Sequence, residues 1–323
     1  MLEWLWLLLP VAAASGWLIG RRGQGRGEAP PVDRALSADY FRGLNHLLNE
    51  RPDKAIEVFI RMLEAEGETA EIHLALGSLF RRRGEVDRAI RLHQNLVARP
   101  SLTAAQRGEA LLELGLDYTR AGLYDRAEAI FQDLVEMRAH GVRALKELLE
   151  IYQQEKEWQK AIDTARRLAS ETGTDLRALV AHFNCELAEL AQAAGAAERA
   201  LGLARKALGT DADCVRASLL LGDLEEARGN AKAALRAYRQ VADQDPGFIP
   251  EVLERMRRCH ATLGRPDDLR DDLQALLPRA HNIAPVLALS ELIENREGRD
   301  PAARFLLQQL EQQPSLRGLY RVI

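Results

Sequence analysis

The sequence predicts an all-α protein, a solenoid of about eight helical hairpins stacked side by side. Of its 323 residues, 47% are apolar and 28% charged but only 5% aromatic, and runs of β-branched residues are scarce. This composition favours helix. The stretch 76–96 contains two apolar-periodic segments with Gly84 in the turn between them. The same pattern recurs at a nearly constant interval along the chain, as expected for a repeat architecture.

A small residue on the second helix of each hairpin marks that interval. Two antiparallel helices need a small side chain where their backbones approach most closely, because a larger one would force them apart. This signature residue is Ala55, Ala89, Ala127, Ala161, Ala200, Ala234 and Ala303, with Leu269 in the place between the last two. The successive gaps are 34, 38, 34, 39, 34, 35 and 34 residues.

The hairpins resemble tetratricopeptide repeats, whose period is 34 residues. Those repeats favour a small residue twelve positions before the signature alanine and an aromatic residue four positions after it. The first preference is met by Gly77, Gly115 and Gly222, and the second by Phe59, Phe131 and Tyr238. The resemblance therefore rests on residue types at fixed positions as well as on the period.

Turn residues and apolar periodicity place eight pairs of helices after residue 37. We expect these pairs at 38–49 with 52–65, 70–83 with 86–98, 104–121 with 124–137, 141–155 with 158–169, 176–194 with 196–208, 212–228 with 231–243, 248–263 with 266–277, and 283–296 with 300–312. Extra residues near 99–108 and 170–178 account for the two longer gaps without breaking the stack. The repeat domain is thus expected over 38–313, winding as a superhelix with a concave groove. Residues 314–323 begin a further apolar-periodic helix and then stop, so the chain looks truncated there.

Residues 1–20, MLEWLWLLLPVAAASGWLIG, predict a transmembrane helix. They carry one charge, Glu3, and as a helix the stretch 4–20 would rise roughly 26 Å, close to the bilayer core of about 30 Å. A cleaved secretory signal is the alternative, but such signals carry positive charge before the apolar run. Here Arg21 and Arg22 follow it, so the positive-inside rule predicts an uncleaved anchor with the repeats in the cytoplasm. Residues 21–37 are rich in Gly and Pro and predict a flexible linker.

Charge and motifs argue against several classes of function. The net charge of -4 provides no attraction to nucleic acid over the whole chain. Cys185, Cys214 and Cys259 lie far apart and form no CxxC pair, which predicts neither a disulfide framework nor a zinc site. The sequence contains no HExxH, GxSxG or P-loop motif, and its seven histidines are dispersed. We therefore expect neither an enzyme nor a bound cofactor or metal.

The first helix of each repeat is the expected partner-binding surface. In the proteins that these repeats resemble, the concave groove is lined by that helix at fixed distances before the signature alanine. Counting back 18, 15, 11, 8 and 7 positions from Ala89, Ala127 and Ala161 selects fifteen residues, which include Glu71, Leu74, Ser78 and Glu109. The basic residues among the fifteen form a strip: Arg81, Arg82, Arg120, Arg143 and Lys146. Such a strip suits an acidic or C-terminal carboxylate segment of a partner protein. A solvated helix face is the alternative, since Arg and Lys are common on helix surfaces.

Anchor, repeats and the residues between consensus positions together resemble the lipopolysaccharide assembly protein B family of Gram-negative bacteria. The likeness is carried by MLEWLWLLLPVAAASGWLIGRR at the start, LGSLFRRRGEVDRAIRLHQNL at 76–96, RAGLYDRAEAIF at 120–131, EWQKAID at 157–163 and AHFNCELA at 181–188. It implies a single-pass inner-membrane protein whose cytoplasmic repeats couple the membrane AAA+ protease FtsH to degradation of LpxC, the deacetylase that commits precursors to lipid A. It also implies restraint by a second inner-membrane protein that senses lipopolysaccharide. Members carry a C-terminal rubredoxin-like metal domain with two CxxC pairs, which this sequence lacks.

Two interpretations of function follow from these observations. The first is a non-enzymatic adaptor whose anchor holds the repeats beside membrane partners while the groove presents a protein to them. The alternative is a scaffold that gathers lipopolysaccharide synthesis enzymes at the inner membrane without directing proteolysis. No feature of the sequence separates these two interpretations.

Overall fold

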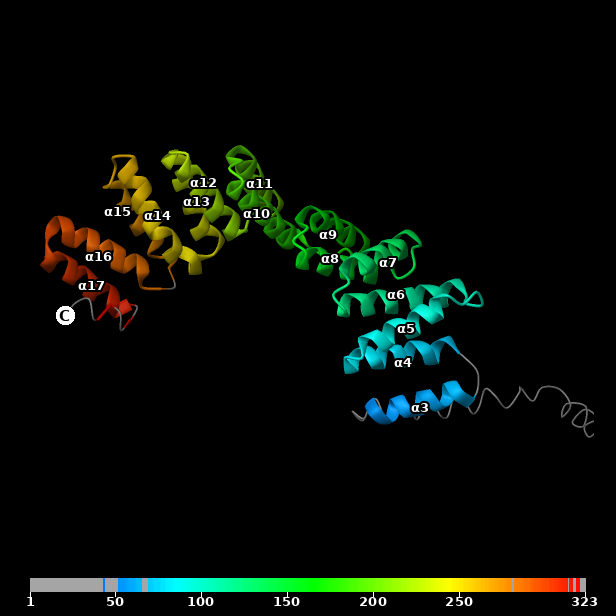
Figure 1. Cartoon of the computed structure of the whole chain (residues 1–323). Coiled ribbons are helices and arrows are strands. Elements are labelled where there is room, and N and C mark those ends of the chain that lie inside the picture. The colour runs from blue at the N-terminus through cyan, green and yellow to red at the C-terminus, as the bar shows by residue number, and fades with distance from the viewer. Residues whose placement is uncertain are drawn as a thin grey trace, which may run out of the picture. The chain divides into compact units, whose positions relative to one another are not determined.

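The computed structural model describes residues 43, 52–65, 69–280, 282–312, 314–315 and 318–319. Within these residues the chain forms fifteen α-helices, α3 to α17, and one short 3-10 helix, η2, and it contains no β-strand (Figure 1). The helices are α3 (Pro52–Ala65), α4 (Ala70–Arg83), α5 (Val86–Val97), α6 (Ala104–Arg120), α7 (Tyr124–Glu136), α8 (Gly141–Gln154), α9 (Trp158–Thr172), α10 (Arg177–Ala193), α11 (Ala197–Thr210), α12 (Val215–Ala227), α13 (Ala231–Gln244), η2 (Pro246–Phe248), α14 (Ile249–Thr262), α15 (Asp268–Leu276), α16 (Ala284–Glu297) and α17 (Arg299–Gln312).

Each described helix begins and ends within three residues of the range predicted from the sequence. The all-helical repeat solenoid is therefore confirmed. The expected anchor 1–20, with its flanking Arg21 and Arg22, and the linker 21–37 lie outside the described residues. Most of the expected first helix, 38–49, and most of the segment 314–323 also lie outside them. In the part of the chain that the structure describes, no helix is both long enough and apolar enough to cross a membrane.

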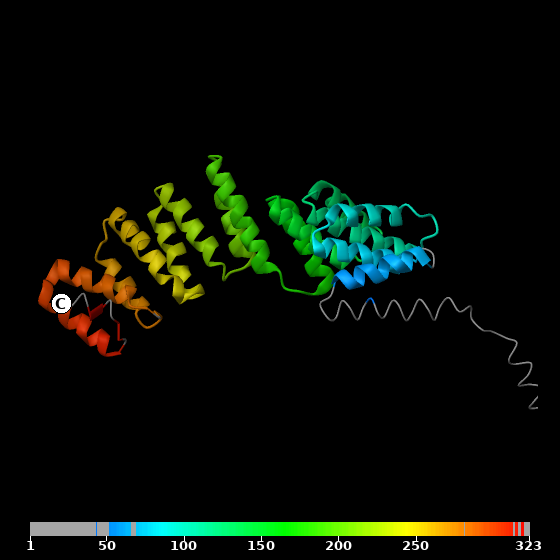
Figure 2. The ribbon, with the colours of Figure 1, turned by 60° about the horizontal axis from the view of Figure 1, so that its bottom comes forward.

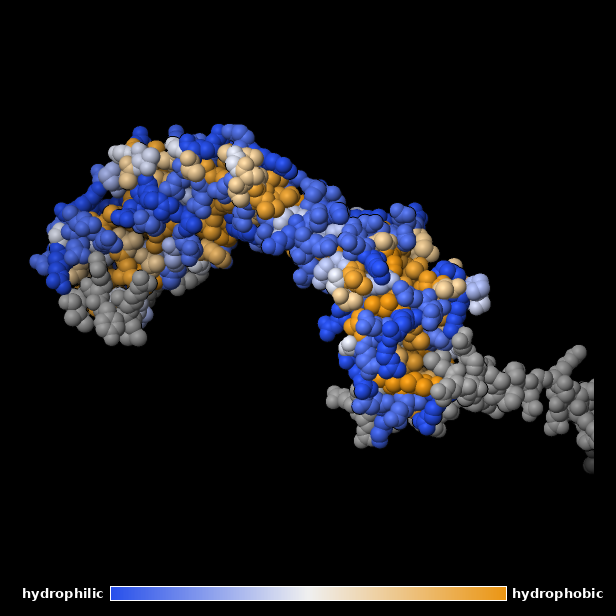
Figure 3. Space-filling model, in the orientation of Figure 1, coloured by the Kyte–Doolittle hydropathy of each residue, from blue (hydrophilic) through white to orange (hydrophobic). Residues whose placement is uncertain are grey.

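The chain divides into two compact units, Met1–Ala144 and Leu145–Ile323. In unit 1, α4 to α7 follow one another as two antiparallel hairpins in chain order (Figure 1). In unit 2, the hairpins from α10 to α17 also follow in chain order, coloured green to red in Figure 2. Hydrophilic side chains cover much of the described surface, with hydrophobic patches among them (Figure 3). The buried apolar residues form clusters shared by successive helices, such as α3 to α5 in one cluster and α10 to α12 in another. Each hairpin thus buries its apolar face against its neighbours, as expected for a repeat array.

The insertions between hairpins lengthen two helices. α6 and α10 have 17 residues each, whereas the other described helices have 9 to 15. The start of α6 is capped by Thr103, whose hydroxyl accepts from the backbone N–H of Gln106 while the Gln106 side chain accepts from the backbone N–H of Thr103. This capping box satisfies two backbone donors at the helix start. The longer gap of 38 residues is therefore absorbed without disturbing the hairpin contacts.

The signature residues lie in the core. The alanines of the first six repeats and the leucine of the seventh are buried: Ala55, Ala89, Ala127, Ala161, Ala200, Ala234 and Leu269. In the last repeat the prediction of Ala303 is wrong by one residue. Ala302 is buried and, like Ala89 in α5, is the fourth residue of its helix, whereas Ala303 is only partly buried. The shift arises because Gly298 alone connects α16 to α17, so that α17 begins at Arg299.

Glycines on the first helices make room for rings on the second helices. A Cβ atom on Gly115 would lie 2.6 Å from Cε1 of Phe131, and one on Gly222 would lie 2.2 Å from Cε1 of Tyr238. Both rings are fully buried. The small residue twelve positions before the signature alanine therefore accommodates the aromatic residue four positions after it, and this contact sets the spacing of the two helices.

Candidate functional site

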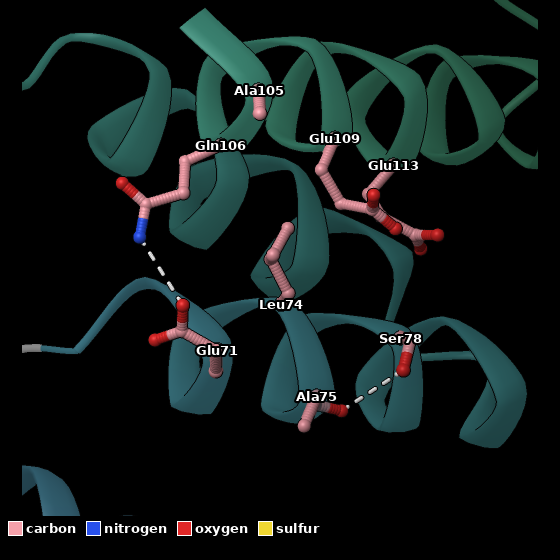
Figure 4. Close-up of a pocket in the computed structure, with 8 residues that line it drawn as sticks. All are labelled: Glu71, Leu74, Ala75, Ser78, Ala105, Gln106, Glu109 and Glu113. Atoms are coloured by element: carbon pink, nitrogen blue, oxygen red, sulfur yellow. Dashed lines mark hydrogen bonds between the residues drawn. The ribbon is translucent and has the colours of Figure 1, made fainter. Parts of the chain in front are cut away.

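An open cleft lies between α4 and α6, the first helices of two successive repeats in unit 1. It has a volume of about 460 Å³ and is lined by Glu71, Leu74, Ala75 and Ser78 of α4 and by Ala105, Gln106, Glu109 and Glu113 of α6 (Figure 4). The side-chain amide of Gln106 donates to Glu71 across the cleft at 3.1 Å (Figure 4). Four of the eight lining residues, Glu71, Leu74, Ser78 and Glu109, come from the positions that the repeat pattern assigned to the groove.

The cleft is acidic at the N-terminal ends of the two helices. Glu71 is exposed, and Glu109 is 46% exposed with its Oε2 3.4 Å from Nε2 of His140. Glu113 is more buried and pairs with Arg81 at 2.6 Å. Negative charge on the cleft wall is therefore only partly neutralised by neighbouring groups.

Arg81 lies beside this cleft and forms ion pairs with two carboxylates of the same chain. Its guanidinium donates to Glu113 and, at 2.7 Å, to Asp117. Burial lowers the pKa of Arg81, but the hydrogen bonds to Asp117 and Glu113 outweigh it, so that the pKa is raised overall. Because these bonds use most of its donors, Arg81 has few left to bind a partner protein, although the sequence predicted it as part of the basic strip.

A buried polar network continues from Arg81 into the core of unit 1. Asp117 is fully buried and accepts from Nδ1 of His93, also fully buried, at 2.5 Å. His93 stands where other repeats have an aromatic ring, and its Nε2 lies against Gly77, where a Cβ atom would be only 2.2 Å away. The network joins α4, α5 and α6 and so couples two successive repeats. Sequence reasoning did not find it, although a histidine at the ring position was a signal.

Arg82 and Arg120 are exposed at the C-terminal ends of α4 and α6. Arg82 follows the cleft residue Glu71 by eleven positions, and Arg120 follows Glu109 by the same number. Eleven residues make about three helical turns, so each arginine lies on the same side of its helix as its glutamate. Within the described part of the chain neither arginine forms an ion pair. The surface formed by these four residues and the cleft between them is called here the A-face of unit 1.

Arg143 and Lys146, the other members of the expected basic strip, are both exposed in the first half of α8. Arg143 belongs to unit 1 and Lys146 to unit 2. Of the expected strip, Arg82 and Arg120 lie in the last turns of α4 and α6, two helices that contact each other.

Unit 2 contains a second, smaller cleft of about 240 Å³ between α14, α15 and α16. Its lining includes Leu253, Leu273 and Leu292, and its rim carries Glu254 and Arg257, which pair with each other at 2.8 Å. This ion pair neutralises part of the rim, which also carries the carboxylate of Glu291. Among the described residues, no group of three or more His, Cys, Asp and Glu side chains is placed to hold a metal ion.

Comparison with known proteins identifies the repeats and the family. A tetratricopeptide repeat family model matches residues 40–105, 112–175 and 185–247. A curated protein of Escherichia coli K12 named lipopolysaccharide assembly protein B is 41% identical over 323 residues, which is 100% of this chain and 83% of that protein. The protein of the same name from Haemophilus influenzae is 38% identical over 327 residues, covering 98% of this chain and 81% of its own length.

Among solved structures, a tetratricopeptide repeat protein from Parabacteroides merdae aligns with a TM-score of 0.39 and 12% sequence identity. The alignment covers 90% of this chain and 98% of that chain. From the family model and the curated relatives, the chain belongs to the lipopolysaccharide assembly protein B family, and its body is built of tetratricopeptide repeats.

Proposed function

We propose that this chain is a non-enzymatic adaptor that regulates lipopolysaccharide biosynthesis by presenting the deacetylase LpxC to the membrane protease FtsH for degradation. Family membership supports a role in lipopolysaccharide assembly, and tetratricopeptide repeats support protein binding. The observation that carries the proposal is the A-face of unit 1, where exposed charges flank an open cleft. An adaptor acts by raising the effective concentration of one partner near another, which requires such a surface rather than a reactive group.

The charge distribution on the A-face suggests what kind of segment it holds. Its acidic end, Glu71 and Glu109, and its basic end, Arg82 and Arg120, are separated by about 16 Å along the helices. An extended segment covers that distance with about five residues. We therefore propose that the partner segment carries a basic and an acidic residue at about that spacing, which would also fix its direction in the cleft.

The adaptor is proposed to act at the inner membrane, with the repeats on the cytoplasmic side. The apolar run 1–20 and the basic flank at Arg21 and Arg22 support a single-pass anchor in this orientation. A second inner-membrane protein that senses lipopolysaccharide is the proposed source of restraint. A reporter active only in the periplasm, fused after Gly318, should remain inactive, and activity of that fusion would contradict the orientation.

The A-face is tested by reversing its basic end. Arg82→Glu with Arg120→Glu should leave thermal stability nearly unchanged, because both side chains are exposed. The same double variant should lengthen the half-life of LpxC in cells and weaken co-purification of LpxC and FtsH. The matched control is Arg61→Glu with Arg91→Glu, which makes the same change in charge at exposed positions on the second helices α3 and α5.

Two outcomes would count against the proposal. If the control slows LpxC degradation as much as the A-face variant, net charge rather than this surface is responsible. If removing the protein from cells leaves the half-life of LpxC unchanged while lipopolysaccharide synthesis enzymes disperse in the membrane, the protein is a scaffold and not an adaptor for proteolysis.

A further inference from the structure

Two of the three cysteines, distant in the sequence, meet in the core of unit 2. Cys185 lies on α10 and Cys214 is the residue immediately before α12, and both are buried free thiols. Each thiol is the leading cause of the pKa shift of the other, raised for Cys185 and lowered for Cys214. They belong to one cluster of twelve buried residues, seven of which are alanine. Side chains this small allow α10, α11 and α12 to pack closely, and the close packing brings the two sulfur atoms together.

A pair of salt bridges next to the thiols holds the two elements in place. Arg216, two residues after Cys214, pairs with Glu186 at 2.7 Å and with Glu189 at 2.8 Å. Glu186 directly follows Cys185 on α10. The arginine therefore fastens the start of α12 to the segment of α10 that carries the other cysteine, so that the thiols remain adjacent.

The two sulfur atoms are not equivalent. The hydrogen bond with Cys185 lowers the pKa of the Cys214 thiol, whereas the same bond, together with burial, raises the pKa of Cys185. Cys214 also stands at the N-terminus of α12, where the positive end of the helix dipole favours a thiolate. Cys214 is thus suited to be the nucleophile, and Cys185 retains its proton until a second step.

We propose that Cys185 and Cys214 form a redox-active dithiol, which a hydroperoxide converts into a disulfide linking α10 to the start of α12. The Cys214 thiolate attacks one peroxide oxygen, the O–O bond breaks, and Cys214 becomes a sulfenic acid while the other oxygen leaves as water after taking up a proton. The Cys185 sulfur then attacks the Cys214 sulfur, the S–O bond breaks, and a second water leaves with the Cys185 proton. In sum, two thiols and one hydrogen peroxide yield one disulfide and two waters. The exposed residues Ala212 and Asp213 form the turn next to Cys214, so the chain beside this thiol is in contact with solvent.

The third cysteine provides a control within the same chain. Cys259 is fully buried on α14, in a different core cluster, and burial raises the pKa of its thiol to about 11. It has no second cysteine among its cluster neighbours. It should therefore stay reduced under conditions that oxidise the pair.

The test uses the full-length chain, purified under reducing conditions and then exposed in its folded state to hydrogen peroxide or to diamide. After rapid unfolding in excess alkylating reagent, mass spectrometry should show the loss of two hydrogen atoms and a cross-linked peptide pair containing Cys185 and Cys214, with Cys259 alkylated. Cys259→Ser should retain the cross-link. Cys185→Ser should abolish it and instead leave Cys214 as a sulfenic acid that a dimedone probe captures.

Two results would overturn the proposal. One is full alkylation of Cys185 and Cys214 after folded protein has been treated with each oxidant. A control with unfolded protein must show that the same oxidants do oxidise its thiols. The other is cross-linking of Cys259 to either cysteine at a similar yield, since that would mean oxidation of unfolded chains. Because every variant differs from the wild type by a single sulfur-to-oxygen exchange, circular dichroism on each one separates loss of reactivity from loss of fold.

Discussion

At the scale of single residues, glycine and a buried ring act as one packing unit. Gly222 on α12 lies against Tyr238 on α13, a fully buried ring whose hydroxyl reaches Asp223 at 2.7 Å and Glu226 at 2.9 Å. Because the ring is held at its far end by two carboxylates, it has no freedom to withdraw from α12. The absence of a side chain at Gly222 is therefore a condition for this helix spacing.

This contact predicts opposite effects for two glycine-to-alanine substitutions in neighbouring hairpins. Gly222→Ala would place a Cβ atom 2.2 Å from the ring and should lower the free energy of unfolding by about 1 to 3 kcal/mol through overpacking. Gly202→Ala, on the exposed side of α11 with no neighbouring atom within 4 Å, should raise it by about 0.5 to 1 kcal/mol, because alanine loses less backbone entropy in a helix. Chemical denaturation followed by circular dichroism measures both. A shift in the same direction for the two variants would contradict the packing unit.

At the scale of elements, the turns inside the hairpins are nearly uniform. Most of those described contain a glycine with positive φ, namely Gly84, Gly122, Gly195, Gly229 and Gly264. The single-residue connection at Gly298 differs, with φ of 96° and ψ of 175°. The turn between α8 and α9 instead has Lys156 at this place, with φ of 59°. Glycine adopts this left-handed conformation without the steric penalty that a Cβ atom imposes. The fourth hairpin therefore carries local backbone strain that the others avoid.

We accordingly expect Lys156→Gly to stabilise the protein. Relief of the left-handed strain, about 1 to 2 kcal/mol, exceeds the added entropy of glycine in the unfolded chain, about 0.4 to 1 kcal/mol, so the net gain should be roughly 0.5 to 1 kcal/mol. The reciprocal change, Gly122→Lys in the preceding hairpin, should destabilise by a similar amount because φ there is 73°. Thermal melts of the two variants against the wild type provide the measurement, and a loss of stability on Lys156→Gly would disprove the strain.

At the scale of the whole molecule, successive repeats are joined by polar contacts as well as by apolar packing. In unit 1, Asp117 receives hydrogen bonds from Arg81 and His93 of the preceding hairpin. In unit 2, Asp223 on α12 pairs with Arg255 on α14, the next first helix, at 2.9 Å. Each contact couples only neighbouring repeats. Loss of one contact should therefore destabilise the repeats beside it and leave distant repeats stable.

Hydrogen exchange distinguishes local destabilisation of neighbouring repeats from destabilisation of the whole array. Asp117→Ala leaves the buried His93 without its partner and should reduce stability locally by about 3 kcal/mol, so exchange should accelerate in α4 to α7 while α12 to α14 keep their protection. Asp223→Ala should produce the reverse pattern, with a smaller effect because its side chain is 39% exposed. Equal acceleration in both regions for either variant would mean that the array unfolds as one cooperative body.

The sequence alone was sufficient to predict the helical hairpins, because the signals that form them are local. A signature alanine such as Ala127, a ring four positions later such as Phe131 and a turn glycine such as Gly122 all lie within one repeat, and their chemistry does not depend on distant residues. The last repeat shows where this reasoning ends, since the single-residue connection at Gly298 moved the buried position to Ala302.

Only the tertiary structure decided which side chains are exposed and which already bond to other residues of the chain. Arg81 and Arg82 are adjacent in the sequence, yet Arg81 is bound to carboxylates on α6 whereas Arg82 is exposed. Cys185 and Cys214 form no sequence motif but meet because α10 and α12 pack beside one another. The physical reason is common to both: residues on the first helices of successive repeats are separated by about one repeat length in the chain, and only stacking of the helices brings their side chains within reach of each other.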